Sequence, residues 1–257
     1  MAFLFNEIIY KPLYNLLVIV YNIIPLHDFG IAIIVVTLLI KFLLVPLSRK
    51  QIESQQKMQE LQPKIKEIQE KYKNDKEKQS RALMELYKEK KTNPFSGCLP
   101  MVVQLIFLIA IYRVFFNISQ AGLTVDTANL YSFVHNPGQI NKLFLGVIDL
   151  SSAVNFSNLA LKDVPHILLV VAAAIVQYYQ TKMLMGKQAL KPANKKETDL
   201  TQAMSKQMLF LGPLLTLFIG IKFPAGLALY WLVSTGFMVG QQYYLQKEVA
   251  KNNQTNS

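Results

Sequence analysis

The sequence predicts an all-α polytopic membrane protein, and three observations support this prediction. Apolar residues make up 52% of the 257 residues and charged residues only 17%, against about 25% charged residues in an average soluble domain. Five stretches are long and apolar enough to form transmembrane helices. The net charge of +11 lies mostly between these stretches. Apolar and basic segments therefore alternate, as they do in membrane proteins with basic water-facing loops.

The composition also excludes other classes of protein. Because the chain has ample apolar surface to bury, it is not disordered, and because Cys98 is the single cysteine, it is not a disulfide scaffold. His27, His135 and His166 are scattered along the chain, so we expect no metal site. The sequence contains no HExxH, GxSxG or Walker A motif. We therefore expect no enzyme and no cofactor.

Five predicted spans follow one another along the chain. They cover residues 29–48, 98–117, 164–185, 208–223 and 225–245. A span needs about 20 mostly apolar residues, and in lipid each of these stretches must satisfy its own backbone as a helix. Only a short link around Pro224 separates the last two, which predicts a tight helical hairpin.

The amino-terminal stretch, residues 1–28, allows two interpretations. It contains Glu7 and Lys11, is interrupted by Pro12, and carries several tyrosines and asparagines. These residues favour an amphipathic helix that lies in the membrane interface. The alternative is a further crossing helix. Since the stretch has no basic n-region and no small-residue cleavage site, we expect no cleavable signal peptide.

The distribution of lysine and arginine predicts the orientation, because both residues are enriched in cytoplasmic loops. Residues 49–97 hold 13 of the 27 basic residues, residues 182–206 hold six, and residues 118–163 hold two. We therefore expect 49–97, the loop 186–207 and the tail 246–257 in the cytoplasm. The amino terminus and the loop 118–163 are then outside. If the amino-terminal stretch also crosses, only the amino terminus changes side.

The segment 49–97 is predicted to be a cytoplasmic helical hairpin. Its residues are rich in the helix formers Gln, Glu and Lys, and an apolar seam at helical spacing begins at Leu61. The turn signal Asn74-Asp75 divides it into helices over about 51–73 and 77–91. Pro63 is expected to kink the first helix or to mark its start.

Basic residues of the two predicted cytoplasmic loops are candidates for contact with anionic lipid headgroups or ribosomal RNA, although most such charges simply solvate a helix face. The candidates are Arg49, Lys50, Lys187, Lys191, Lys195 and Lys196. No motif for reading a nucleic-acid sequence is present, so we expect no sequence-specific nucleic acid as a partner.

Polar residues inside the predicted spans are the candidate functional residues. Lys41 lies in the middle of the first span, where a lysine costs about 2.5–3.5 kcal/mol. It must therefore face the bundle interior or a wet cavity, or else snorkel to the interface. Thr37 lies one turn before it on the same face.

Other polar residues in the spans have two interpretations each. Gln104, Gln177 and Gln180 either line the same cavity as Lys41 or only join helices by hydrogen bonds. Arg113 and Trp231 lie near span ends, where such side chains usually anchor a helix in the interface. No acidic residue lies in the five spans. This argues against a transporter coupled to protons or cations.

A basic group in a bundle without acidic residues suits a guest that has an acidic polar end and a hydrophobic body. A nascent membrane segment with a short acidic tail fits this description. On physical grounds alone, an anion channel or a lipid-handling protein fits nearly as well.

Particular motifs carry a resemblance to a known family. They are Tyr10-Lys-Pro-Leu-Tyr-Asn-Leu-Leu; the segment from Gly30 to Leu47 with Thr37 and Lys41; Asn93-Pro94, Gly97-Cys98-Leu99-Pro100 and Gln104; Gln180-Thr-Lys-Met; and Phe223-Pro-Ala-Gly-Leu-Ala-Leu-Tyr-Trp with Ser234 and Gln241-Gln242. Over about residues 8–247 the chain resembles the YidC/Oxa1/Alb3 membrane protein insertases.

This resemblance implies five spans around a hydrophilic groove that is open to the cytoplasm and to lipid but closed outward. The groove residues would be Lys41, Thr37, Gln104, Gln177 and Trp231. The implied partners are nascent membrane proteins, the Sec translocon, the ribosome and membrane lipids. The implied activity is insertion without ATP hydrolysis. An anion channel or transporter built on Lys41, and a structural accessory of the Sec translocon, remain the alternatives.

The chain departs from the family pattern at three points. The basic residue of the groove is usually arginine and here is Lys41, which keeps the charge but loses the bidentate fork. The family's proline two residues after Gln104 is Ile106 here. No large extracytoplasmic domain is present, which suggests a minimal bacterial member. Because no transit peptide is apparent, we expect the bacterial plasma (inner) membrane.

Overall fold

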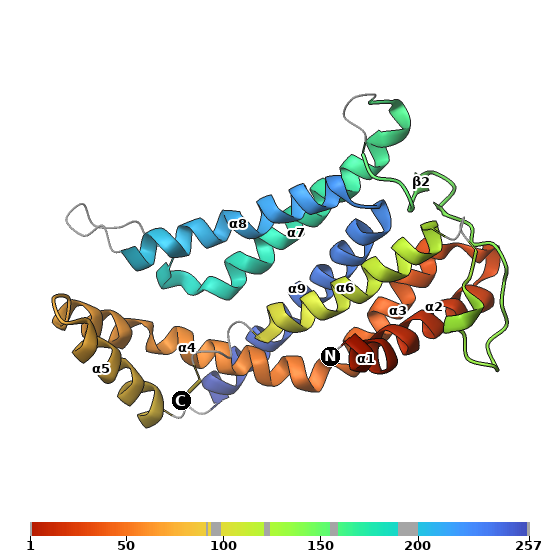
Figure 1. The fold of residues 1–257 in the computed structure, drawn as a ribbon. Coiled ribbons are helices and arrows are strands. Elements are labelled where there is room, and N and C mark those ends of the chain that lie inside the picture. The colour runs from red at the N-terminus through yellow and green to blue at the C-terminus, as the bar shows by residue number, and fades with distance from the viewer. Residues whose placement is uncertain are drawn as a thin grey trace.

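The computed structural model describes residues 2–90, 92–93, 99–120, 124–154, 159–189 and 200–255. In these residues the regular structure is helical apart from one short β-hairpin (Figure 1). The first half contains α1 (Ala2–Phe5), a π-helical turn (Asn6–Tyr10), α2 (Lys11–Ile23), a 3₁₀ turn (Pro25–His27), α3 (Phe29–Leu43), α4 (Val45–Lys71), α5 (Lys76–Glu89) and α6 (Leu99–Gln120). The second half contains the 3₁₀ turn Thr127–Asn129, β1 (Leu143–Phe144), β2 (Ile148–Asp149), the 3₁₀ turn Leu161–Asp163, α7 (Val164–Ala189), α8 (Leu200–Lys222) and α9 (Ala225–Thr255).

Helix α9 lies at the centre of the bundle. It contacts α3, α6, α7 and α8, while α7 packs along α8 and α2 packs along α3 (Figure 1). Small residues allow close approach: a Cβ on Gly226 would lie 2.0 Å from Phe115 of α6, and one on Gly220 would lie 2.7 Å from Val170 of α7. The polar residues on α9 are therefore placed among four other helices.

The first predicted span, 29–48, is not one straight helix in the structure. Helix α3 ends at Leu43, and the chain bends by 64° into α4. Pro46 explains the bend, because proline lacks the N–H for the helical bond and its ring clashes with the carbonyl four residues earlier. The prediction treated this proline as part of the span. Lys41 consequently lies in the last turn of α3.

Length and composition identify candidate membrane-crossing helices among the described residues. Phe3–Ile23 and Leu161–Met185 are long and apolar enough, and α3 with α4 forms a third candidate if the bent pair counts as one span. Val102–Ile118 and Leu209–Lys222 are shorter apolar helices. The chain is thus a helical protein with several candidate membrane helices, and the count of five remains a prediction.

The loop between α6 and α7 packs on α2. The Tyr14 hydroxyl accepts a hydrogen bond from the Asp126 amide at 2.8 Å, and the Tyr21 hydroxyl accepts one from the Asn141 amide at 2.9 Å. Asn15 Oδ1 accepts a hydrogen bond from the Tyr131 amide at 2.7 Å. An irregular loop does not occur in contact with the hydrocarbon, because its backbone would lack partners. These contacts are an argument for the interfacial interpretation of the amino-terminal stretch, which stays a prediction because Phe3–Ile23 is also long and apolar enough to cross.

The β-hairpin covers the end of the bundle where α3 begins. Asp28 caps α3, with Oδ1 accepting from the amides of Gly30 at 2.8 Å and Ile31 at 3.1 Å, while Oδ2 accepts from the Leu145 amide at 2.7 Å. The Phe144 ring lies against Gly30, where a Cβ would come within 2.2 Å of it.

The residues after β1 also cover the turn between α8 and α9. The Gly226 amide donates to the Leu150 carbonyl at 3.1 Å, and the Ala225 amide donates to the Ser152 carbonyl at 3.0 Å. The Val154 amide donates to the carbonyl at the end of α8 at 3.2 Å. The loop is therefore bonded both to the beginning of α3 and to the α8–α9 turn.

Helices α4 and α5 form a separate hairpin at the opposite end. Leu61 and Ile65 of α4 meet Leu86 of α5 in a small apolar cluster of their own. The carboxylate of Asp75 caps α5 by accepting from the Lys78 amide at 3.0 Å. Helix α4 continues through Pro63. The hypothesis that the first helix of the hairpin starts at this proline is therefore wrong.

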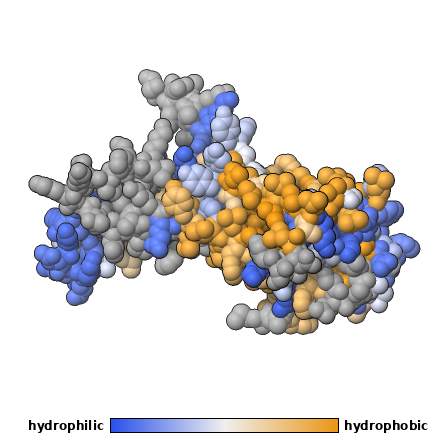
Figure 2. Space-filling model, turned by 90° about the horizontal axis from the view of Figure 1, so that it is seen from above, coloured by the Kyte–Doolittle hydropathy of each residue, from blue (hydrophilic) through white to orange (hydrophobic). Residues whose placement is uncertain are grey.

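Apolar and polar surfaces are separated along the molecule. Figure 2 shows an apolar surface between hydrophilic ends, and one of these ends is the α4–α5 hairpin. The exposed large apolar side chains of the longer helices include Phe42 on α3, Leu105 on α6, Leu168 on α7 and Phe218 on α8. This is the surface pattern of a protein embedded in lipid.

Replacement of Gly30 by alanine is expected to lower stability. The new Cβ would overlap the Phe144 ring, including its own Cβ at 2.8 Å, and such overpacking costs about 1–3 kcal/mol. Gly236→Ala is the matched control, since nothing lies within 4 Å of its Cβ position in α9 and alanine favours a helix by about 1 kcal/mol. Thermal unfolding in detergent micelles measures both. Equal melting temperatures for the two variants would contradict the close packing of β1 on α3.

Candidate polar site inside the bundle

The first polar cluster joins three helices through Gln104. The Lys41 ammonium of α3 donates to Gln104 Oε1 of α6 at 3.0 Å. The Ser234 hydroxyl of α9 donates to the same oxygen at 2.9 Å. Ser234 is fully buried, and Lys41 and Gln104 are half-buried. One amide oxygen thus holds both a cation and a hydroxyl between α3, α6 and α9.

The other half of the Gln104 amide finds no partner among the residues that the structure describes. Its Nε2 is buried and makes no hydrogen bond to any of them, although an unsatisfied buried donor costs about 1–3 kcal/mol. Among the described residues no carboxylate lies within ion-pair distance of Lys41. The cluster therefore holds a cation without a counter-ion next to an N–H donor without an acceptor, and both would be satisfied by an acceptor with negative charge.

The second polar cluster lies between α7 and α9. The Trp231 indole Nε1 donates to Gln177 Oε1 at 3.0 Å, and Gln177 Nε2 donates to Thr181 Oγ1 at 3.5 Å. Gly212 of α8 lies opposite this cluster. A Cβ on Gly212 would lie 3.6 Å from Gln177 Nε2, which is an ordinary van der Waals contact. Trp231 and Ser234 are three residues apart on α9, so the two clusters adjoin on one helix face.

The structure separates the predicted groove residues into those that meet and those that do not. It brings Lys41 to Gln104 and brings Gln177 to Trp231. Thr37 joins neither cluster, because it is 1% exposed and its hydroxyl donates to the Ile33 carbonyl of its own helix at 2.6 Å. Ser234 is not among the predicted groove residues, although its spacing from Trp231 along the helix is a signal that identifies it.

Two further polar residues from the sequence analysis have partners elsewhere. Gln180 Nε2 donates to the Met238 sulfur at 3.4 Å, which joins α7 to α9. Arg113 Nη1 donates to Asn6 Oδ1 at 3.2 Å, and the guanidinium lies 5.0 Å from the Phe5 ring centroid. Arg113 therefore ties α6 to the amino-terminal helix.

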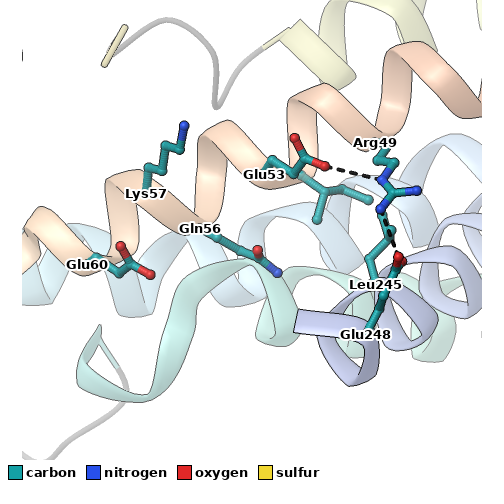
Figure 3. A pocket seen from close by; sticks show the side chains of 8 residues that line it. Arg49, Glu53, Gln56, Lys57, Glu60, Leu245 and Glu248 are labelled. Atoms are coloured by element: carbon teal, nitrogen blue, oxygen red, sulfur yellow. Dashed lines mark hydrogen bonds and ion pairs between the residues drawn. The ribbon is translucent and has the colours of Figure 1, made fainter. Parts of the chain in front are cut away.

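Arg49 connects the start of α4 to α9. Its guanidinium forms ion pairs with Glu248 at 2.9 Å and with Glu53 at 3.2 Å, as Figure 3 shows. The hydrogen bond to Glu248, and to a smaller extent the one to Glu53, raise the pKa of Arg49. The side chains border a cavity of about 330 Å³ between α4 and the α9 end, which Lys57 and Glu60 also line. Arg49 thus serves contacts within the chain.

Of the other basic residues predicted to contact lipid or ribosomal RNA, Lys50 is the one whose side chain the structure describes. Lys50 is exposed on α4. Lys187 lies in α7, but its side chain, together with Lys191, Lys195 and Lys196, lies outside the described residues. Over the part of the chain that is described, no group of three or more His, Cys, Asp or Glu residues is placed to hold a metal ion.

The helical bundle, the lipid-type surface and the buried cation together define a membrane protein that presents a charged polar cluster to its own interior. The family model of the 60Kd inner membrane protein matches residues 19–253. The chain therefore belongs to the 60Kd inner membrane protein family, and it is a multi-pass protein of the inner membrane.

Relatives agree with this assignment. The chain is 35% identical over 242 residues to the membrane protein insertase YidC of Citrifermentans bemidjiense, covering 93% of this chain and 37% of the relative. It is 37% identical over 244 residues to that of Syntrophus aciditrophicus, covering 92% and 36%. The chain thus spans about a third of the length of these curated relatives.

A solved structure also matches. It is the active YidC insertase crystal structure with the first transmembrane domain resolved, with a TM-score of 0.51 and 27% identity. The match covers 85% of this chain and 42% of that chain. The family resemblance read from the sequence is confirmed.

The hydrogen bond between Trp231 and Gln177 is expected to stabilise the bundle. A double-mutant cycle with Trp231→Phe and Gln177→Leu should give a coupling of about 0.6 kcal/mol, the average for such bonds in membranes. The control cycle pairs Trp231→Phe with Gln180→Leu, because Gln180 bonds Met238 instead. Unfolding in mixed micelles measures both cycles, and equal couplings would contradict a specific Trp231–Gln177 contact.

Proposed function

We propose that this chain is a membrane protein insertase. It captures the acidic or polar tail of a nascent membrane protein at Lys41 and releases the hydrophobic segment into the bilayer. The observation that carries the proposal is the Lys41–Gln104–Ser234 cluster, a cation without a counter-ion inside a bundle whose relatives are named membrane protein insertases. No catalytic step and no cofactor are needed for this work.

Capture rests on charge and on the unsatisfied amide. A substrate carboxylate near Lys41 supplies the missing counter-ion and accepts the free N–H of Gln104. Charge-assisted bonds of this kind are about twice as strong as neutral ones. Lysine offers a point charge instead of the planar arginine fork, so it attracts a carboxylate without fixing its orientation. Weak, short-lived binding of this kind suits a substrate that must move on.

Release is driven by the substrate itself. Each Å² of apolar surface that leaves water contributes about 25 cal/mol, so a hydrophobic helix gains far more in lipid than its tail gains at Lys41. A membrane potential adds about 2.3 kcal/mol per charge per 100 mV. The substrate then leaves past α7 and α9, which border the second polar cluster.

The covered end of the bundle supports insertion over conduction. The loop residues close over the start of α3 through Phe144 and over the α8–α9 turn through Leu150 and Ser152. A channel built on Lys41 needs a path through this end, whereas an insertase needs its polar site closed there. We therefore propose a groove that is open towards the lipid and towards the α4–α5 side.

The topology and partners are part of the same proposal. Five spans with the α4–α5 hairpin, the α7–α8 loop and the tail in the cytoplasm would place the β-hairpin outside, with the amino-terminal helix in the interface. Contacts of α4 with α7 and α9 support this grouping, because Gln59 bonds the Leu184 carbonyl and Arg49 bonds Glu248 at one end of the bundle. The Sec translocon, the ribosome and anionic lipids are the proposed partners besides the nascent chain.

Reconstitution into liposomes tests the proposal. A single-span substrate with an acidic tail is synthesised outside vesicles that contain the purified chain, and protection from protease reports insertion. Wild type and Lys41→Arg should protect the substrate, and Lys41→Ala should lose at least tenfold, because only the first two keep the charge. No protection by folded wild type above empty vesicles would overturn the insertase. Anion flux through the same vesicles would indicate a channel instead.

Replacing Gln104 by glutamate tests the electrostatic step separately. A carboxylate at this position would neutralise Lys41, so Gln104→Glu should reduce insertion of a substrate with an aspartate tail while sparing one with an asparagine tail. Gln104→Leu, which removes the polar group without adding charge, is the matched control. If Gln104→Glu impairs both substrates equally, capture by charge is wrong.

A further inference from the structure

The turn of the β-hairpin carries apolar side chains where polar ones are usual. Val147 N–H donates to the Phe144 carbonyl at 3.0 Å and closes the turn, whose central residues Leu145 and Gly146 have φ values of 52° and 72°. Turns with positive φ at both central positions favour asparagine followed by glycine. Leucine at the first position is strained, because its Cβ crowds the following carbonyl.

These apolar side chains also point away from the protein. Leu145 is 67% exposed and Val147 is 61% exposed. Leu26, in the turn between α2 and α3, is 86% exposed and has a positive φ of 70°. Two leucines thus occupy strained turn positions without packing on the chain, so protein stability does not explain them.

Asp28 joins the beginning of α3 to the tip of the hairpin. Its carboxylate accepts the amides of Gly30 and Ile31 in the first turn of the helix and the amide of Leu145 at the hairpin tip. Leu26 is two residues from Asp28 along the chain. Leu26 and the hairpin tip that carries Leu145 and Val147 therefore lie near the beginning of α3, and Ile23 at the end of α2 is exposed as well.

The hairpin is polar at its base and apolar at its tip. At the base, Lys142 pairs with Asp149 at 2.8 Å. At the tip, the Leu145 and Val147 amides already have intramolecular partners. A protein partner that adds a strand needs free backbone groups along an edge, whereas lipid contact requires that backbone groups be satisfied. These observations favour a lipid surface as the occupant.

We propose that Leu26, Leu145 and Val147 insert into the bilayer leaflet at the amino-terminal end of α3, at the boundary between headgroups and acyl chains. The tip then fixes the depth of α3. Lys41 lies 13 residues beyond Asp28, or about 20 Å along the helix. The anchor would thereby set the depth at which the Lys41 charge is held, and it does so whether or not the chain inserts other proteins.

Site-specific fluorescence in vesicles tests the anchor. In a Cys98→Ser background, Val147→Cys and Ser132→Cys are labelled with an environment-sensitive NBD probe, and the chain is reconstituted into phosphatidylglycerol–phosphatidylethanolamine vesicles. Ser132 is also exposed but lies elsewhere in the same loop. The probe at 147 should emit at shorter wavelength and be quenched at least twofold more by nitroxide-labelled lipids than the probe at 132. Equal quenching at the two sites would overturn the proposal.

A double variant separates lipid contact from folding. Leu26→Asn with Leu145→Asn keeps every backbone hydrogen bond and suits the positive φ at both positions, so stability in detergent should not fall. In vesicles, quenching of the probe at 147 should drop to the level seen at 132. If the variant is stable and quenching is unchanged, these leucines do not anchor the tip. Because the readout is probe depth, its failure is distinct from failure of the insertion assay.

Discussion

The unbalanced charge of Lys41 is the feature on which the interior of this protein depends. A lysine at membrane depth is costly. Within the described part of the chain its hydrogen-bond partner is a neutral amide oxygen of α6 that also accepts from α9. A carboxylate partner would neutralise this charge, and in the proposed function it would block capture, since a permanent ion pair leaves no charge to attract a guest. The neutral amide is a compromise: it positions the ammonium and leaves its charge available.

The close packing around this site depends on residues with little or no side chain. Gly226 lets α9 approach Phe115 of α6, and Gly220 lets α8 approach Val170 of α7. In lipid, where helices gain no hydrophobic energy by associating, such close contacts and a few hydrogen bonds are the main attractive forces. The two polar clusters are therefore part of the cohesion of the bundle as well as its candidate site.

The sequence identifies the polar residues of the site, but not which of them pair between helices. Lys41, Gln104, Gln177 and Trp231 stand out because a polar residue within an apolar stretch is costly wherever it points. Their pairing is not visible, since it depends on the relative rotation and depth of different helices. The sequence likewise does not show how α3 is rotated, so it predicts Thr37 in the groove, whereas in the structure the Thr37 hydroxyl donates to the Ile33 carbonyl of its own helix.

The bend after α3 places Lys41 near one end of the helix, which matters for the proposed insertion function. Pro46 ends α3 at Leu43, only two residues after Lys41, and turns α4 by 64°. A straight helix would bury the ammonium a further turn or more from the end of its span. The bend instead brings the charge close to the point where the chain turns towards the polar α4–α5 hairpin, while Asp28 and Phe144 close the opposite end of α3. A single proline thus makes the site asymmetric, with its cation near the α4 side, and this asymmetry is what a one-sided polar site for arriving segments requires.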